Sequence, residues 1–170
     1  NQKTLIMKNI ILKNGIFAGL IVSGFMAAMT LYMKTNPEME PSMVVGFAGM
    51  IVAFSFIFIG IKQQRSANNG SISFGSAFLT GFLISLIASV MYVMVWLIIY
   101  YNVFPNFIEH YSEMMIKKAK PEDLAKVTEE MNQYKEWYKS PIMVILLTLM
   151  EILPMGIVVS LIGALLLKKK

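Results

Sequence analysis

The chain has 170 residues, 56% of them hydrophobic, and a mean hydropathy of +0.63. A soluble domain is only about 45–50% apolar, so this composition argues against one. The chain contains no cysteine, which excludes disulfides and thiolate chemistry.

The apolar residues are concentrated in four long runs, which cover residues 10–33, 43–61, 74–100 and 141–167. Each run reaches the roughly 20 residues that a helix needs to cross a bilayer, the second only barely. We therefore predict an all-α, four-transmembrane-helix bundle that forms a single membrane domain over residues 1–170. The remaining residues are too few for a separate soluble catalytic domain.

The net charge of +5 is unevenly distributed. Three segments hold basic residues and no acidic ones: Lys3, Lys8 and Lys13 in the N-terminal segment, Lys62 and Arg65 after the second run, and Lys168, Lys169 and Lys170 at the end. By the positive-inside rule these segments are cytoplasmic, both termini included. The charge thus indicates a topology signal rather than a nucleic-acid partner. For a bacterial source, the helical spans predict a multi-pass inner-membrane protein, because outer-membrane spans are β-barrels.

Small residues recur at four-residue intervals along the runs, which places them on one face of each helix. They are Gly15, Gly19, Ser23 and Ala27 in the first run, Gly49 and Ala53 in the second, Ala77, Gly81, Ser85 and Ser89 in the third, and Gly156, Ser160 and Ala164 in the fourth. Such small-xxx-small stripes let membrane helices approach closely. We interpret them as packing seams within the chain, with a homo-oligomer or a membrane-protein partner as the alternatives.

The predicted cytoplasmic loop between the second and third runs carries turn and capping signals. Asn69 and Gly70 favour a turn, and Ser73 is placed to cap a helix that starts at Phe74. Gly75 would allow close approach at that helix start. No strand precedes this glycine and no Lys-Ser/Thr pair follows it, so a phosphate-binding loop is not indicated.

Residues 101–140 form the longest polar segment, predicted to be extracytoplasmic. Apolar residues recur in it at helical spacing, first over 107–115 and then over 124–138. Pro121 separates the two patterns and suits a first helical position. We expect an amphipathic helical hairpin between spans three and four.

Glu151 is the only acidic residue in any of the four apolar runs. It lies roughly 15 Å into the fourth run at 1.5 Å per residue, and Pro154 frees the Met150 carbonyl from its helical hydrogen bond. An ionised carboxylate at that depth needs a partner, water or a proton. Candidate hydroxyl partners at similar depth are Ser23, Ser55, Ser89 and Tyr92. The two interpretations are a structural hydrogen bond across the packed bundle and an intramembrane relay or substrate contact.

Other catalytic or metal-binding patterns are weak. His110, with Glu109 and Glu113 nearby, is the only histidine, and a zinc site needs three or four ligands of preferred types. We therefore predict no metal, no cofactor and no enzymatic activity.

Several motifs resemble one known family. The matching features include Asn69-Gly70-Ser71-Ile72-Ser73-Phe74-Gly75, Tyr92 and Trp96, Ser140-Pro141, and Glu151-Ile152-Leu153-Pro154-Met155-Gly156. The chain resembles the domain of unknown function 4199, a family of small inner-membrane proteins mostly from Bacteroidetes. It departs from the family pattern at Ser76, often Lys there, and at Met155, often Val. The resemblance implies four spans and an inner-membrane location, and no activity.

Our leading functional hypothesis is a non-enzymatic accessory or scaffold subunit that contacts the lipid bilayer and binds a membrane partner. The alternative is small-solute, ion or lipid transport involving Glu151. A component of a membrane-lipid or lipid-linked-sugar enzyme comes third.

Overall fold

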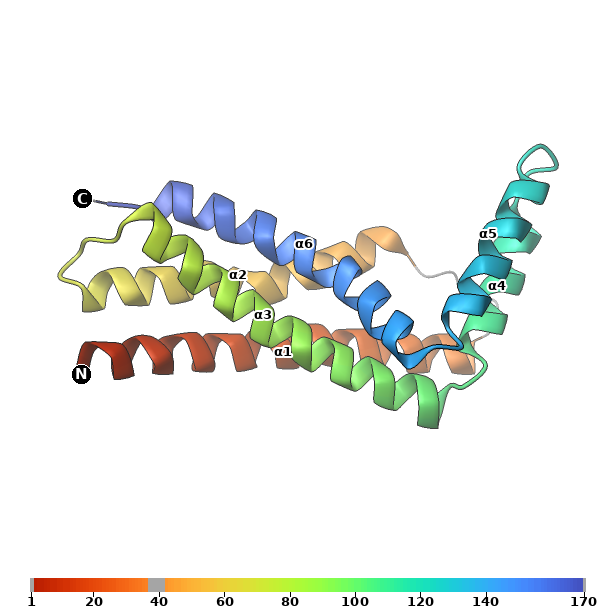
Figure 1. The fold of residues 1–170 in the computed structure, drawn as a ribbon, viewed down its shortest axis with the longest axis horizontal. Coiled ribbons are helices and arrows are strands. Elements are labelled where there is room, and N and C mark those ends of the chain that lie inside the picture. The colour runs from red at the N-terminus through yellow and green to blue at the C-terminus, as the bar shows by residue number, and fades with distance from the viewer. Residues whose placement is uncertain (1, 37–41, 170) are drawn as a thin grey trace.

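The computed structural model describes residues 2–36 and 42–169, and every regular element in them is helical apart from one isolated bridge (Figure 1). The elements are α1 (Gln2–Thr35), α2 (Met43–Ala67), α3 (Phe74–Ile98), the π-helix η1 (Ile99–Val103), α4 (Phe107–Lys118), α5 (Leu124–Trp137) and α6 (Pro141–Leu167). The predicted all-α fold is confirmed.

Four of these helical stretches are long and apolar enough to cross a membrane, namely α1, α2, α3 with η1, and α6. The predicted fourth span matches α6, but α1 begins eight residues before the predicted first span and α2 ends six residues after the predicted second. Hydrophobicity marks the part of a helix that is apolar, whereas capping decides where the helix ends. The α2 helix therefore continues through Lys62 and Arg65 until a turn stops it.

That turn closes α2 with a Schellman-type cap, in which the Gly70 N–H bonds the Arg65 carbonyl at 2.9 Å. Asn69 has φ 57° and Gly70 has φ 87°, the left-handed conformation that Asn and Gly tolerate best. Ser73 then caps α3, because its hydroxyl accepts from the Ser76 N–H at 3.3 Å. Among the described residues no atom lies within 4 Å of the position where a Gly75 Cβ would be, so the close approach predicted there stays a prediction.

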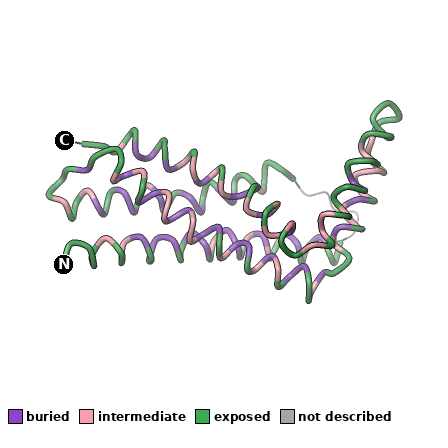
Figure 2. Tube along the Cα trace, viewed as in Figure 1, coloured by how far each residue is buried: buried purple, intermediate pink, exposed green. Residues whose placement is uncertain are grey.

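The long helices run side by side, with both described chain ends and the α2–α3 loop at one end of the bundle (Figure 1). Helix α3 is central, since it packs along α1 on one side and α6 on the other, while α2 contacts all three. Buried residues follow the inward faces of these helices (Figure 2). Backbone hydrogen bonds of 2.8 and 2.9 Å between Ile72 and Lys169 tie the α2–α3 loop to the end of α6.

The α3–α6 interface uses the predicted small residues reciprocally. A Cβ on Gly81 of α3 would lie 3.0 Å from the Cβ of Ser160 of α6, and a Cβ on Gly156 of α6 would lie 2.5 Å from that of Ser85 of α3. Real Cβ atoms do not approach so closely, so both glycines are required for this spacing. Ser85 and Ser160 are fully buried and each donates its hydroxyl to a carbonyl of its own helix, so neither hydroxyl is left without an acceptor.

The other seams also pack within the chain. Gly15 and Gly19 of α1 contact Ile87 and Met91 of α3, and Gly49 of α2 contacts the ring of Phe25 of α1. Ala53 is likewise fully buried. These seam glycines therefore already have neighbours from their own chain.

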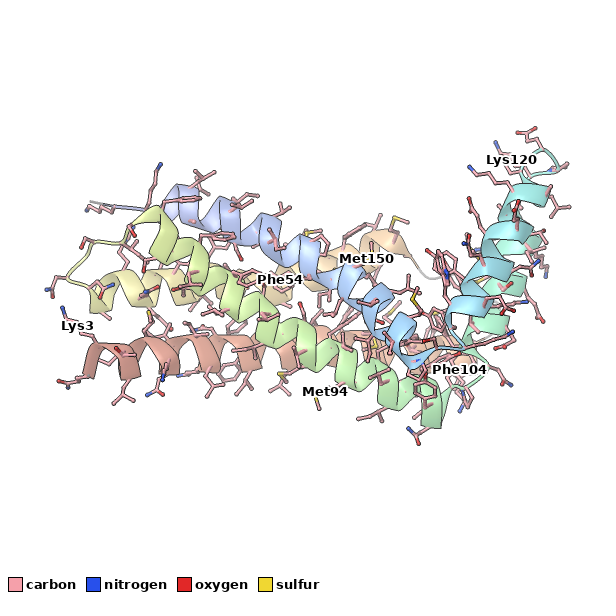
Figure 3. All side chains as sticks on the ribbon, in the orientation of Figure 1. Lys3, Phe54, Met94, Phe104, Lys120 and Met150 are labelled. Carbon is pink, nitrogen blue, oxygen red and sulfur yellow. The ribbon has the colours of Figure 1, made fainter. Side chains whose placement is uncertain are left out.

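Helices α4 and α5 pack on each other as a hairpin at the far end of the bundle, as predicted. The hairpin stands across the bundle axis, and its tip at Lys120 projects beyond the flank (Figures 1 and 3). Helix α5 begins at Leu124 rather than at Pro121, because residues 121–123 form a turn closed by the Asp123 N–H on the Lys120 carbonyl. At the foot of the hairpin, Lys34 Nζ donates to the Val103 carbonyl at 2.6 Å.

The reciprocal glycine contact makes a stability prediction. Gly156→Ala inserts a methyl group against Ser85 and should destabilise the protein by about 1–3 kcal/mol through overpacking. Gly24→Ala is the matched control, because its Cβ would meet nothing within 4 Å and alanine favours a helix by about 1 kcal/mol over glycine. Thermal unfolding in mild detergent should show a lower midpoint for the first variant only. Equal midpoints would show that the interface is looser than described.

Candidate functional site

Glu151 lies on the flank of the bundle and not in its interior. The buried positions of α6 follow a four-residue stripe: Val144, Thr148, Ile152, Gly156 and Ser160. Glu151 precedes Ile152 by one residue, which turns its side chain about 100° away from that stripe, and the residue is exposed. The expectation of a carboxylate inside the packed bundle is therefore corrected. Counting back four residues from Gly156, the same interval that separates it from Ser160, gives Ile152 as the buried position. The sequence therefore already contained the signal that Glu151 faces away from the interior.

One of the four candidate hydroxyls meets the carboxylate. The Tyr92 hydroxyl of α3 donates to Glu151 Oε1 at 3.2 Å, across the α3–α6 interface. Tyr92 is only 6% exposed, so it presents its hydroxyl from the core towards the flank. The structure brings this pair together across 59 positions of sequence.

The three serines lie elsewhere. Ser55 and Ser89 donate to backbone carbonyls of their own helices at 2.6 and 2.7 Å. The hydroxyl of Ser23 is buried and has no partner among the described residues. Equal depth in the membrane thus does not bring these hydroxyls to Glu151, because they lie at other angles around their helices.

Pro154 adds a second polar group to the same flank. It lies inside α6, is exposed, and has no N–H to offer the Met150 carbonyl. Met150 itself is 73% exposed on the outer side of α6 (Figure 3). The flank therefore carries two polar groups. One is the Glu151 carboxylate, to which Tyr92 donates, and the other is the Met150 carbonyl, which lacks its helical donor.

Aromatic residues connect this flank to the hairpin. The ring of Tyr138, just before α6, lies 5.1 Å from that of Tyr100, which in turn stacks with the ring of Trp96 of α3 at 6.1 Å. Burial raises the pKa of the Tyr138 phenol, and the nearby Glu151 carboxylate raises it further. Burial likewise raises the pKa of Tyr111 in α4. Both phenols thus stay protonated at neutral pH and keep their hydrogens as donors.

A buried polar network at the opposite end of the bundle was not foreseen. Gln64 of α2 is 3% exposed and donates its amide to Ser76 Oγ at 3.0 Å and to Met7 Sδ at 3.2 Å, while Thr80 donates to its carbonyl oxygen. The predicted second span ends at Ile61, which places Gln64 in a loop. Its position four residues after the buried Gly60 was the signal that it faces the interior.

His110 does not assemble a metal site in the part of the chain that the structure describes. No group of three or more His, Cys, Asp or Glu side chains gathers there. The His110 ring lies 5.9 Å from the Phe104 ring, and its Nε2 is buried without a partner among the described residues.

The Tyr92–Glu151 contact can be measured with a double-mutant cycle. Tyr92→Phe and Glu151→Leu should each change the free energy of unfolding, with a coupling of about 0.6 kcal/mol and at most about 1.7 kcal/mol, as for other hydrogen bonds in membranes. Unfolding in mixed detergent micelles gives the four values. A control cycle pairs Glu151→Leu with Tyr32→Phe instead of Tyr92→Phe. Tyr32 is 53% exposed, and this control should give no coupling. Zero coupling for the Tyr92 cycle would refute the contact.

Comparison with known proteins finds one family. Residues 13–169 match the family model described as a protein of unknown function (DUF4199). No match is found among the curated proteins or among the solved structures. Since the match covers nearly the whole chain, this multi-pass membrane protein with four candidate spans belongs to the DUF4199 family.

Proposed function

We propose that the protein is a non-enzymatic accessory subunit of the bacterial inner membrane that binds a second membrane protein through the Glu151 flank of α6. The observation that carries this proposal is an exposed glutamate residue within an apolar span. The partner we infer is a transmembrane helix that presents a lysine, an arginine or another hydrogen-bond donor at the depth of Glu151.

Lipid alone is a poor neighbour for this flank. A charged side chain near the middle of a span costs about 2.5–3.5 kcal/mol when no partner compensates it. Tyr92 supplies one hydrogen bond, but a carboxylate has about four acceptor sites. The Met150 carbonyl beside it also lacks its helical donor. A donor from a second protein would satisfy both groups.

The surroundings of Glu151 suit a helix partner. An outward ridge of exposed residues runs along α6 at four-residue intervals and consists of Ile142, Leu146, Met150, Pro154, Val158, Ile162 and Leu166. Such a ridge fits a groove of a neighbouring helix. Lipid chains also fit an apolar ridge, so Glu151 at its edge is the feature that favours a protein.

The glycine contacts within the chain also favour a partner on an outer face of the bundle. Because Gly15, Gly19, Gly81 and Gly156 already have contacts within the chain, they offer no seam to a partner. Binding must therefore use an outer face, and the outer face of α6 carries both Glu151 and the Met150 carbonyl, which Pro154 leaves without its helical donor.

Transport through Glu151 is the alternative and has less support. One cavity, of about 200 Å³, lies at the end that holds the chain termini, and another, of about 410 Å³, lies at the hairpin tip. Neither is lined by Glu151. A relay would need water on both sides of the carboxylate.

Site-specific cross-linking tests the proposed partner face. A photoreactive residue at Met150 should cross-link a distinct membrane protein in native membranes, whereas one at Leu20, 57% exposed on α1, should not. Glu151→Leu should reduce the Met150 adduct about tenfold, the loss expected when about 1.4 kcal/mol of binding is removed. An adduct of twice the chain mass would identify a second copy instead. Equal adducts from both positions would contradict a specific face.

The orientation is also a proposal, with both termini in the cytoplasm, and the lack of native cysteine makes it easy to test. Ser71→Cys in the α2–α3 loop is at an exposed position, Thr128→Cys in α5 is at a partly exposed one, and the two positions lie in polar segments at opposite ends of the bundle. A membrane-impermeant maleimide applied to spheroplasts should label Thr128→Cys directly and Ser71→Cys only after permeabilisation. The reverse pattern would invert the topology.

A further inference from the structure

A cavity of about 200 Å³ opens between α1, α2 and the start of α3, at the end of the bundle that holds both described chain ends. Its polar lining includes Lys3, Thr4, Gln64, Asn68 and Ser76. Its apolar lining includes Ile6 and Ile10. Pockets for drug-sized ligands measure about 300–1,000 Å³, so this one has room for a headgroup rather than for a whole lipid.

The floor of the cavity is a fixed polar surface. The Gln64 amide is held by Ser76, Met7 and Thr80, so its position does not depend on a ligand. Ser76 accepts the Gln64 amide through Oγ, and no described residue takes its hydroxyl proton. That proton is therefore available to an acceptor in the cavity.

The electrostatics of this end favour an anion. All charged residues of the described segments 2–18, 60–80 and 152–169 are basic. Lys3 lines the cavity itself, whereas Arg65 is engaged with the Leu167 carbonyl at 3.3 Å. Ser76 also lies in the first turn of α3, where the helix dipole is positive.

The remaining walls favour an acyl chain. Ile6 is 42% exposed and Ile10 follows it by one turn, so the pair forms an apolar edge that leads from the cavity towards the membrane side of α1. A ligand with a phosphate beside Lys3 and Ser76 could place hydrocarbon along this edge. Inorganic phosphate would share the polar contacts only.

We propose that this cavity binds the phosphate headgroup of an anionic glycerophospholipid of the adjacent leaflet. Lys3 supplies the charge, Ser76 supplies a hydrogen bond, and Ile6 and Ile10 contact the first part of an acyl chain. The site is independent of the Glu151 flank, which faces outward from α6.

Lipid binding by the purified full chain tests the proposal. With phosphatidylcholine and phosphatidylglycerol supplied together to the protein in detergent, native mass spectrometry should count bound phosphatidylglycerol in preference to phosphatidylcholine. Lys3→Ala should weaken the affinity for phosphatidylglycerol about fivefold, as expected for one lysine at an anionic surface. Lys8→Ala is the matched control, an exposed lysine of the same helix that does not line the cavity, and it should have no effect.

Further outcomes decide between sources of the phosphate. Ser76→Ala should also weaken phosphatidylglycerol binding, but it removes the Oγ that accepts from the buried Gln64 amide, so its unfolding midpoint should fall as well. Lys3→Ala removes no buried hydrogen bond, so its binding should weaken at an unchanged midpoint. Inorganic phosphate at an excess over the lipid should not displace it; displacement would assign the cavity to a free anion and overturn the lipid proposal. Equal losses in Lys3→Ala and Lys8→Ala would show a diffuse charge effect and overturn the site itself.

Discussion

The close approach of α3 and α6 is the contact on which the rest of the bundle depends. Gly81 meets Ser160 and Gly156 meets Ser85, so each helix supplies one glycine and one serine to its neighbour. Lipid tails are as apolar as leucine, and packing between membrane helices must therefore rely on short distances and van der Waals contact. With α3 held against α6 on one side and against the α1 glycines on the other, α2 completes a core around the fully buried Phe54.

This contact also determines the setting of Glu151. Because the buried stripe of α6 runs through Ile152 and Gly156, the carboxylate falls at the edge of the interface, where Tyr92 reaches it from α3. The Tyr92–Glu151 hydrogen bond thus crosses the glycine-packed interface of α3 and α6, and its acceptor lies on the outward flank of α6. The arrangement explains how a polar group can contribute to the bundle and still be available to a neighbour in the membrane.

The two ends of the bundle differ in chemistry. One end carries basic side chains, a buried amide network around Gln64 and a loop paired with the C-terminal tail. The other end carries an aromatic cluster around Trp96 and Tyr138 and the mixed-charge hairpin. Basic residues favour an anionic lipid surface, and aromatic residues favour the interface between headgroups and tails. This asymmetry supports the proposed orientation, in which the basic end of the bundle faces the cytoplasm.

The sequence alone determined the helical class, four spans, the hairpin, the turn at Asn69-Gly70 and the spacing of the small residues. These depend on local properties: apolar length, helical periodicity and the conformational preference of single residues. Helix ends beyond the apolar runs, the burial of Gln64 and the exposure of Glu151 were decided by the tertiary structure. Depth in the membrane follows from counting residues, but the direction in which a side chain points depends on how each helix is rotated against its neighbours. That rotation is set by the glycine contacts between α3 and α6, and only the assembled bundle shows them paired.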